Sequence, residues 1–311
     1  MKRTLIAAAV LTLGCATAAA QGRVDFSKLE IATTNLGHGL YLLNWQGGDS
    51  LVLTGDDGVL LVDASVPEMT AKIRAAVAKI SDKPIRLVIN THAHADHFGG
   101  NEVLAEAGAI IVAHDNVRRR MESGQYLAAF NQTIPPSPPA ALPTVTFADA
   151  MTIHFDGETI ELIHAPNAHT DSDTLVWFRR ADVIHASGTF SSGSAYPFFD
   201  TSSGGSLTGM IGAEAKMLSL SDERTKIIPD EGDPGSKAAL QASHDMLVTV
   251  RARVGKLIAQ GKTEAEAIAA KPTQDLDPRW APKGGFVTGD AYTRMAYDSL
   301  RGIKPPTTPP G

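Results

Sequence analysis

The stretch that decides the fold runs from Thr91 to Asn101 and reads Thr-His-Ala-His-Ala-Asp-His-Phe-Gly-Gly-Asn. It follows an apolar segment, residues 84–89, that is typical of a β-strand. His92 and His94 are two residues apart at the end of this strand, so their side chains project to the same side. Clustered imidazoles are hard to place in a core because each ring needs partners for two nitrogens, whereas imidazole and carboxylate are groups that zinc accepts. The segment therefore predicts a metal site, with a solvated histidine-rich loop as the alternative.

The segments around this stretch predict alternating strands and helices. Residues 39–66 read as strand, turn and strand, and residues 67–81 have helical spacing with a proline at the start. Helix, strand and helix follow up to about Ser123, and the proline-rich residues 133–143 indicate a loop. The later elements are expected at 151–155 paired with 158–164, 174–178 paired with 182–186, helix 207–219, strand 225–229 and helix 237–260. This order suits two βαβ-like halves packed face to face with helices outside.

A second motif lies at residues 168–173, which read Ala-His-Thr-Asp-Ser-Asp, and Asp63 ends an earlier predicted strand. With these, the His-x-His-x-Asp-His pattern of residues 92–97 resembles the metallo-β-lactamase-fold superfamily over about residues 39–260. The resemblance implies the α/β fold of that superfamily, a four-layer αββα sandwich with a one- or two-metal site at the edge of its sheets.

The resemblance also implies a set of metal ligands. His92, His94 and His169 match the three histidines of the first metal site, and Asp96 and His97 match two ligands of the second. Three histidines that leave a fourth position open are the arrangement of a catalytic zinc. We therefore expect the first site to bind one zinc ion tightly.

Two positions depart from the superfamily pattern. Members carry an aspartate, or in some β-lactamases a cysteine or serine, after a strand like residues 182–185, where this chain has Gly188. A Pro-Gly-His-Gly-like turn that supplies a last histidine reads Pro-Asp-Glu-Gly at residues 229–232, which places Glu231 at the ligand position. Glycine has no side chain to coordinate a metal, but a glutamate carboxylate can do so. A second zinc is therefore expected to bind weakly or not at all.

The activity implied by the resemblance is that of a zinc-dependent hydrolase. Zinc-bound hydroxide would attack the carbonyl of a small ester, amide, lactone or β-lactam, with Asp96 as the catalytic residue that orients the water or carries its proton. The alternative is a catalytically impaired member that binds a metal or a ligand, which Gly188 and Glu231 favour and the intact histidine triad opposes. Iron and manganese also accept such ligands, so the native metal stays open.

The composition narrows the class of partner. Lys and Arg number 28 against 34 Asp and Glu, so the formal net charge is −6, and no basic run is present. An acidic chain of this kind is expected to act on a small molecule and not on nucleic acid. One cysteine excludes a disulfide framework and a cysteine-ligated zinc module. No stretch approaches the ~20 apolar residues of a transmembrane helix, and the oligomeric state stays open.

The N-terminus has the layout of a secretory signal. A basic Lys2-Arg3 pair precedes an apolar run at 4–13, and three alanines end at Ala20. We expect residues 1–20 to be a signal peptide and the mature protein to be periplasmic or secreted, with lipid anchoring at Cys15 as a minor alternative. Residues 21–303 would then form one hydrolase domain, followed by a disordered proline-rich tail at 304–311.

Other polar residues near these motifs have simpler interpretations. His164 and His185 lie at strand ends, where they could bond to metal ligands or be ordinary satisfied side chains. Asp171 and Asp173 are expected to stabilise a turn, with metal ligation as a remote alternative.

Substrate clues in the sequence are fewer. Four aromatic side chains follow positions of the metal motifs and could line an apolar wall or pack in the core: Phe98, Tyr196, Phe198 and Phe199. Between Arg180 and Lys216 there is no Lys or Arg. The lysine with which one β-lactamase subclass holds the carboxylate of the drug is therefore absent, and β-lactam hydrolysis is one candidate activity among several.

Overall fold

The computed structural model describes residues 24–306 and 308–309. The predicted signal peptide at 1–20 and Cys15 lie outside the described residues, as do three residues of the predicted tail at 304–311. Export and the proposed domain limits therefore stay predictions. Among the described residues, the helices are all too short or too polar to cross a membrane.

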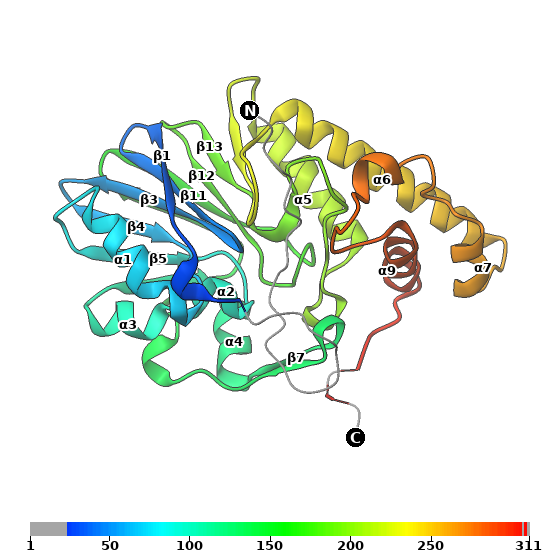
Figure 1. Cartoon of the computed structure of the whole chain (residues 1–311), viewed down its shortest axis with the longest axis horizontal. Helices are drawn as coiled ribbons and strands as arrows, with labels where there is room; N and C mark the ends of the chain where they lie inside the picture. The colour runs from blue at the N-terminus through cyan, green and yellow to red at the C-terminus, as the bar shows by residue number, and fades with distance from the viewer. Residues whose placement is uncertain (1–23, 307, 310–311) are drawn as a thin grey trace.

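Two β-sheets packed face to face form the centre of the molecule (Figure 1). The first sheet has seven strands in the order β1-β2-β3-β4-β5-β6-β9, with bounds Ala32–Gly37, Leu40–Trp45, Gly48–Gly55, Gly58–Val62, Ile85–Asn90, Ile110–His114 and Val145–Phe147. The second has six strands in the order β10 to β15, with bounds Ala150–Phe155, Glu158–His164, Thr174–Phe178, Val183–His185, Lys226–Ile228 and Gly235–Ser236.

Helices cover the outer face of each sheet, which completes four layers (Figure 1). The first sheet carries α1 (Thr70–Ala78) and α3 (Asn101–Glu106), with α4 (Asp115–Ser123) near its lower edge. The second carries α5 (Leu207–Leu220), α6 (Lys237–Ala259) and α9 (Gly289–Arg301). The predicted αββα sandwich is therefore confirmed.

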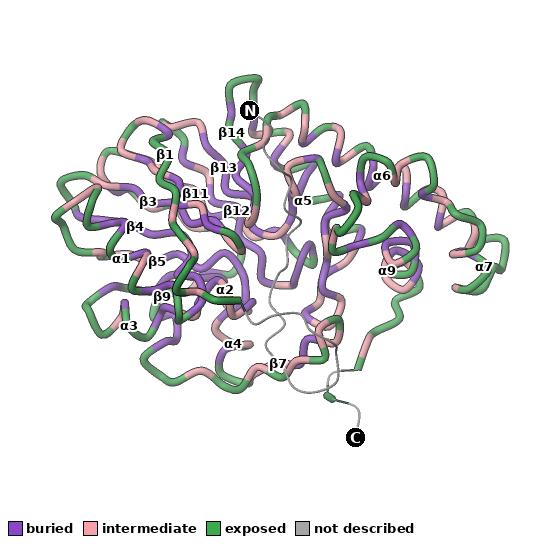
Figure 2. Tube along the Cα trace, in the orientation of Figure 1, coloured by how far each residue is buried: buried purple, intermediate pink, exposed green. Residues whose placement is uncertain are grey.

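Alternation along the strands builds separate hydrophobic cores. In β4, Leu60 and Val62 belong to the core between the sheets, whereas Val59 and Leu61 belong to the core under α1. Such a strand is buried on both faces, so it reads as a continuous apolar run. Figure 2 shows the same arrangement, with buried residues concentrated in the strands and exposed residues on the outer helices.

The predicted elements up to residue 260 correspond closely to those observed. Residues 174–178 form β12 with the predicted bounds, and the predicted helix 237–260 is α6. Within the segment 133–143, predicted as a loop, residues up to Ile134 belong to β8 (Gln132–Ile134), which pairs only with β7 (Gln125–Leu127) in a small ribbon. Sequence reasoning assigned no helix after residue 260, where α7 (Glu264–Ala269), α8 (Asp277–Trp280) and α9 lie.

The two glycines that end the histidine stretch allow the motif to pack closely against the loop after β4. A Cβ on Gly99 would lie 2.4 Å from Pro67 Cδ, and one on Gly100 would lie 2.6 Å from the Ala64 carbonyl oxygen. The Ala64 N–H also donates to the His97 carbonyl at 2.8 Å. These contacts hold the short helix α2 (Ala95–Phe98) at the edge of the first sheet.

Candidate metal centre

The candidate site lies where loops from both sheets meet. His92 and His94 follow β5, and His169 lies in the loop between β11 and β12. Two hydrogen bonds join these loops: the Thr174 N–H donates to the Thr91 carbonyl at 2.8 Å, and the Ala93 N–H donates to Ser172 Oγ at 3.1 Å. The loop after β5 and the loop between β11 and β12 are thus held together by these two hydrogen bonds.

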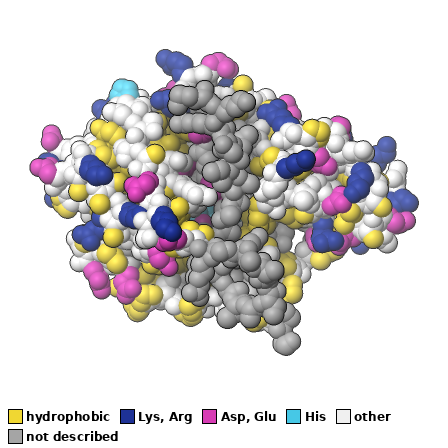
Figure 3. Space-filling view, viewed as in Figure 1, with side chains coloured by type: hydrophobic (Ala, Val, Ile, Leu, Met, Phe, Trp, Pro, Cys, Tyr) yellow, Lys and Arg dark blue, Asp and Glu magenta, His cyan; other side chains and the backbone are white. Residues whose placement is uncertain are grey.

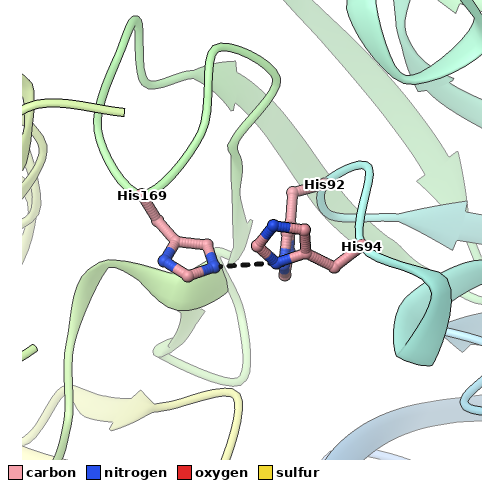
Figure 4. A group of neighbouring side chains, drawn as sticks. All are labelled: His92, His94 and His169. Atoms are coloured by element: carbon pink, nitrogen blue, oxygen red, sulfur yellow. Dashed lines mark hydrogen bonds between the residues drawn. The ribbon is translucent and has the colours of Figure 1, made fainter. Parts of the chain in front are cut away.

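The three histidines of the predicted first site converge (Figure 4). Each pair of rings has its centroids 4.8 Å apart, and the ring planes are nearly perpendicular, at 78° to 88°. His94 Nδ1 lies 3.1 Å from both His92 Nε2 and His169 Nε2. All three side chains are buried. The rings are therefore arranged around one common point.

Outward hydrogen bonds fix the protons of two of these rings. His94 Nε2 donates to the buried carboxylate of Asp200 at 3.2 Å, so its Nδ1 carries the lone pair. His169 Nδ1 donates to the Phe198 carbonyl at 2.8 Å, so its Nε2 carries the lone pair. Both lone pairs face the common point. Asp200 was not identified from the sequence, because nothing in its local context marks it as a histidine partner.

The third ring, His92, also has its proton on the outward nitrogen, as its two hydroxyl neighbours indicate. His92 Nδ1 lies 3.1 Å from Thr91 Oγ1 and 3.3 Å from Ser187 Oγ. Both hydroxyls donate to carboxylates, Thr91 to Asp63 at 2.8 Å and Ser187 to Asp173 at 3.0 Å. Since each hydroxyl has only one proton, His92 Nδ1 is the donor to these oxygens and its Nε2 lone pair faces the common point.

Three inward lone pairs with no proton between them fit a metal ion. Burial lowers the pKa of His92 well below its usual value, and burial followed by the neighbouring His94 lowers the pKa of His169 to about 3. Both rings are thus neutral at pH 7. Tetrahedral zinc with Zn–N distances of about 2.0–2.1 Å needs nitrogens about 3.3 Å apart, close to the spacing found here. The residues present therefore fit a cation held by three imidazoles.

A second group of potential ligands contains His92, His97 and Asp230. His97 Nδ1 donates to Asp63 at 2.9 Å, and its Nε2 lies 3.6 Å from Asp96 Oδ2 and 3.8 Å from Asp230 Oδ2. Burial lowers the pKa of His97, but the surrounding carboxylates outweigh it and raise that pKa to about 10. This cluster consequently attracts positive charge.

Asp230, and not the predicted Glu231, belongs to the groups of potential ligands found among the described residues. The Asp49 N–H donates to the Asp230 carbonyl at 2.8 Å, which fixes the backbone of this turn. Burial raises the pKa of Glu231, and the negative charge of Asp96 raises it further. Glu231 therefore lies near Asp96. Ligation by Glu231 stays a prediction, and Asp230 is a further candidate ligand that the sequence analysis did not name.

His185 completes a third group with Asp63 and Asp230. Its Nδ1 accepts from the Ser187 N–H at 3.2 Å, but its Nε2 is buried with no hydrogen-bond partner, as is Asp230 Oδ1. His185 thus lies next to the candidate ligand Asp230, although no hydrogen bond joins the two side chains in the described structure.

The structure gives the other polar candidates roles in holding the loops. Arg120 binds both carboxylate oxygens of Asp171, at 2.8 and 2.9 Å. Asp173 accepts from the Thr170 N–H at 2.7 Å within the same loop. His164 contacts the Asp171 carbonyl at 3.1 Å and bonds to none of the three converging histidines among the described residues.

Gly188 lies directly against His169. A Cβ on Gly188 would be 2.3 Å from His169 Cδ2 and 2.7 Å from its Nε2. A side chain at this position would therefore collide with a predicted first-site ligand. Glycine at this position provides no bridging ligand, and its lack of a side chain leaves room for the His169 imidazole.

Comparisons with known proteins agree with this geometry. The family model described as "Metallo-beta-lactamase superfamily" matches residues 43–249, more than half of the chain. Among curated relatives, the metallo-beta-lactamase type 2 of Bacillus cereus is 30% identical over 44% of this chain and 48% of its own length. The 2,4-dinitroanisole O-demethylase subunit alpha of a Nocardioides species is 27% identical over 47% of this chain and 42% of its own length.

Solved structures show the same fold. A metallo-beta-lactamase from Pontibacter korlensis aligns with a TM-score of 0.58 and 18% identity, covering 70% of this chain and 99% of that one. A sec-alkylsulfatase from a Pseudomonas species aligns with a TM-score of 0.68 and 18% identity, covering 88% of this chain and 50% of that one. The chain spans less than half the length of the curated relatives named above. The family match, the sandwich and the converging histidines together show that the chain belongs to the metallo-β-lactamase superfamily.

Proposed function

We propose that this protein is a zinc-dependent hydrolase that adds water to the carbonyl of a small ester, amide, lactone or β-lactam. The observation that carries the proposal is the set of three inward imidazole lone pairs at His92, His94 and His169, each fixed by an outward hydrogen bond. Ligand sets whose second ring nitrogen is held in this way are typical of metal sites.

Four residues of the chain have assigned roles in this proposed reaction. His92, His94 and His169 would hold the ion, which when bound supplies a Lewis acid that acidifies water and polarises a carbonyl. Asp96 has a side chain 28% exposed, 3.6 Å from His97 Nε2, so its carboxylate is accessible beside the triad. We assign Asp96 the role of orienting the attacking water and accepting its proton.

Metal removal and restoration test this function. The purified protein is stripped with a chelator, reloaded with zinc, iron or manganese, and assayed on a neutral ester, a lactone, a cephalosporin and an alkyl sulfate. Turnover of at least one carbonyl substrate is expected to disappear with the metal and return with zinc. If zinc binds at one equivalent per chain and no substrate is turned over, the alternative of a catalytically impaired metal-binding member is correct.

Zinc stoichiometry distinguishes Asp230 from Glu231 as the ligand of a weak second site. In Asp230→Asn the second equivalent is expected to bind at least about tenfold more weakly, because a carboxylate of the His97 cluster is lost. Glu231→Gln serves as the matched control and is expected to leave both equivalents unchanged. Zinc titration with a competing chelator measures both. The opposite pattern would identify Glu231 as the ligand.

A further inference from the structure

Three phenylalanine rings meet beside the candidate site although they come from distant segments. Phe130 ends the short helix η3 (Ala128–Phe130), Phe198 precedes η6 (Thr201–Ser203), and Phe286 lies in the loop before α9. Their ring centroids are 5.5 to 5.7 Å apart in each pair, with Phe130 and Phe286 stacked at 16°. We call these three residues the aromatic wall.

The aromatic wall is partly exposed to solvent. Phe286 is 54% exposed, and Phe130 and Phe198 are half-buried. Tyr196 and Phe199 are buried in the hydrophobic core under α5 and α6, against which Phe198 also packs. Clustered aromatic rings left open to water mark a binding surface more often than a packing defect, because their burial by a ligand is favourable.

Phe198 connects this surface directly to the histidine triad. Its ring centroid lies 5.8 Å from that of His169, at an angle of 71°, and its carbonyl accepts the His169 Nδ1 proton. A small molecule whose reacting group lies at the triad therefore has its neighbouring atoms within reach of the aromatic wall. Phe130 and Phe286 extend the surface away from the metal ligands.

Charge around the site restricts the chemistry of that small molecule further. Among the described residues, the side-chain ion pairs of His92, His94 and His97 all involve aspartates. Arg120 is paired with Asp171, and the segment that supplies Phe198 contains no Lys or Arg between Arg180 and Lys216. The loop that supplies Phe286 carries one exposed base, Lys283. Away from the residues drawn in grey, the face in Figure 3 has basic and acidic side chains interspersed over its surface.

We propose that the aromatic wall binds an uncharged alkyl or aryl group of the substrate, so that the enzyme selects neutral, apolar carbonyl compounds over anionic ones. This inference rests on the proposed hydrolase function. The apolar group packs against Phe130, Phe198 and Phe286 while its carbonyl lies at the histidine triad. A carboxylate on that group would lose its hydration against the three apolar rings, and this desolvation would weaken binding.

An ester series tests the proposal by changing one property at a time. The probes are 4-nitrophenyl acetate, butyrate, hexanoate and octanoate, together with the mono-4-nitrophenyl ester of adipic acid, which matches the hexanoate but ends in a carboxylate. In the zinc-loaded protein, kcat/KM is expected to rise about two- to fourfold per added methylene. The adipate ester is expected to be at least about tenfold poorer than the hexanoate.

Phe286→Ala and Ile110→Ala form a matched pair of variants. Both remove an exposed apolar side chain, but Ile110 lies on β6, outside the aromatic wall. Phe286→Ala is expected to flatten the dependence on chain length, so that the loss of kcat/KM grows from the acetate to the octanoate ester, while the zinc content stays that of the wild type. Ile110→Ala is expected to retain the dependence. A general folding defect would lower all esters equally, and an unaltered slope in Phe286→Ala would overturn the proposal.

A binding measurement separates this inference from the proposed function. The non-hydrolysable ketone 2-decanone is titrated calorimetrically into the zinc-loaded wild type and into Phe286→Ala. Weaker binding to the variant is expected. If none of the ester, lactone and cephalosporin substrates is turned over, the proposed function is wrong, and the titration alone decides the inference: equal binding to both proteins, or binding to neither, overturns it.

Discussion

Replacing His169 with alanine is expected to reduce zinc affinity about 10²- to 10³-fold and to reduce zinc-dependent turnover by a similar factor. A zinc site contributes roughly 10–16 kcal/mol, and shared among four ligands this amounts to roughly 2.5–4 kcal/mol for each. His169 is the only ring of the triad supplied by the second sheet. Its loss leaves His92 and His94, which lie on one loop, with no ligand opposite them.

Zinc titration of the purified variant measures this effect, and His154→Ala is the matched control. His154 is an exposed histidine on β10 whose ring is hydrogen-bonded to Thr159 Oγ1 at 3.3 Å and to no other described side chain. We expect the control to bind zinc like the wild type. Retention of one tightly held zinc in His169→Ala would show that the three rings do not form the metal site.

Adding a single methyl group at Gly188 is expected to weaken zinc binding about 10- to 100-fold. The new Cβ would lie 2.3 Å from His169 Cδ2, well inside van der Waals contact, so the ring or the η5 turn (Ser187–Thr189) has to move. His169 cannot move freely, because its Nδ1 is bonded to the Phe198 carbonyl. Displacing a ligand that is oriented in this way costs affinity comparable to losing its supporting bond.

Gly212→Ala provides the control for Gly188→Ala. Gly212 lies within α5, and a Cβ there meets no atom within 4 Å. Its replacement is expected to stabilise the protein by about 0.5–1 kcal/mol without changing zinc affinity. Chelator competition gives the affinities and thermal unfolding the stabilities. Unchanged zinc affinity in Gly188→Ala would mean that residue 188 does not constrain the His169 ring.

The contact between residue 188 and His169 also affects a Gly188→Asp substitution, which would restore the aspartate of the superfamily pattern. An aspartate at position 188 would begin with the colliding Cβ, so it would displace His169 before its carboxylate could bridge two metals. From the sequence, Gly188 is a missing ligand. The packing shows that it is also a position where this chain has no room for one.

Sequence reasoning succeeded where the signal was local. The apolar runs of β4 and β12, and the spacing of His92 and His94, are patterns among neighbouring residues of the chain. It failed for helices α7, α8 and α9. Of these, α7 and α8 are short, with six and four residues, so their apolar spacing hardly repeats.

The choice between Asp230 and Glu231 as the candidate ligand could not be made from the sequence. Residues 230–233 form a bend, which has no fixed side-chain period from which the residue nearer to His97 could be predicted. The Asp49 N–H donates to the Asp230 carbonyl and holds this bend, and that bond joins residues 181 positions apart in the chain.

The sequence by itself determined the family, the strand that carries His92 and His94, and the identity of the three imidazoles, because these are written in short patterns with fixed backbone spacing. Only the tertiary structure decided which nitrogen of each ring faces the metal centre, that Asp200 and Ser187 hold those rings, and that Phe130 and Phe286 join Phe198. Those features depend on side chains from both sheets meeting at one edge, and contacts between distant segments leave no periodic signal in the chain.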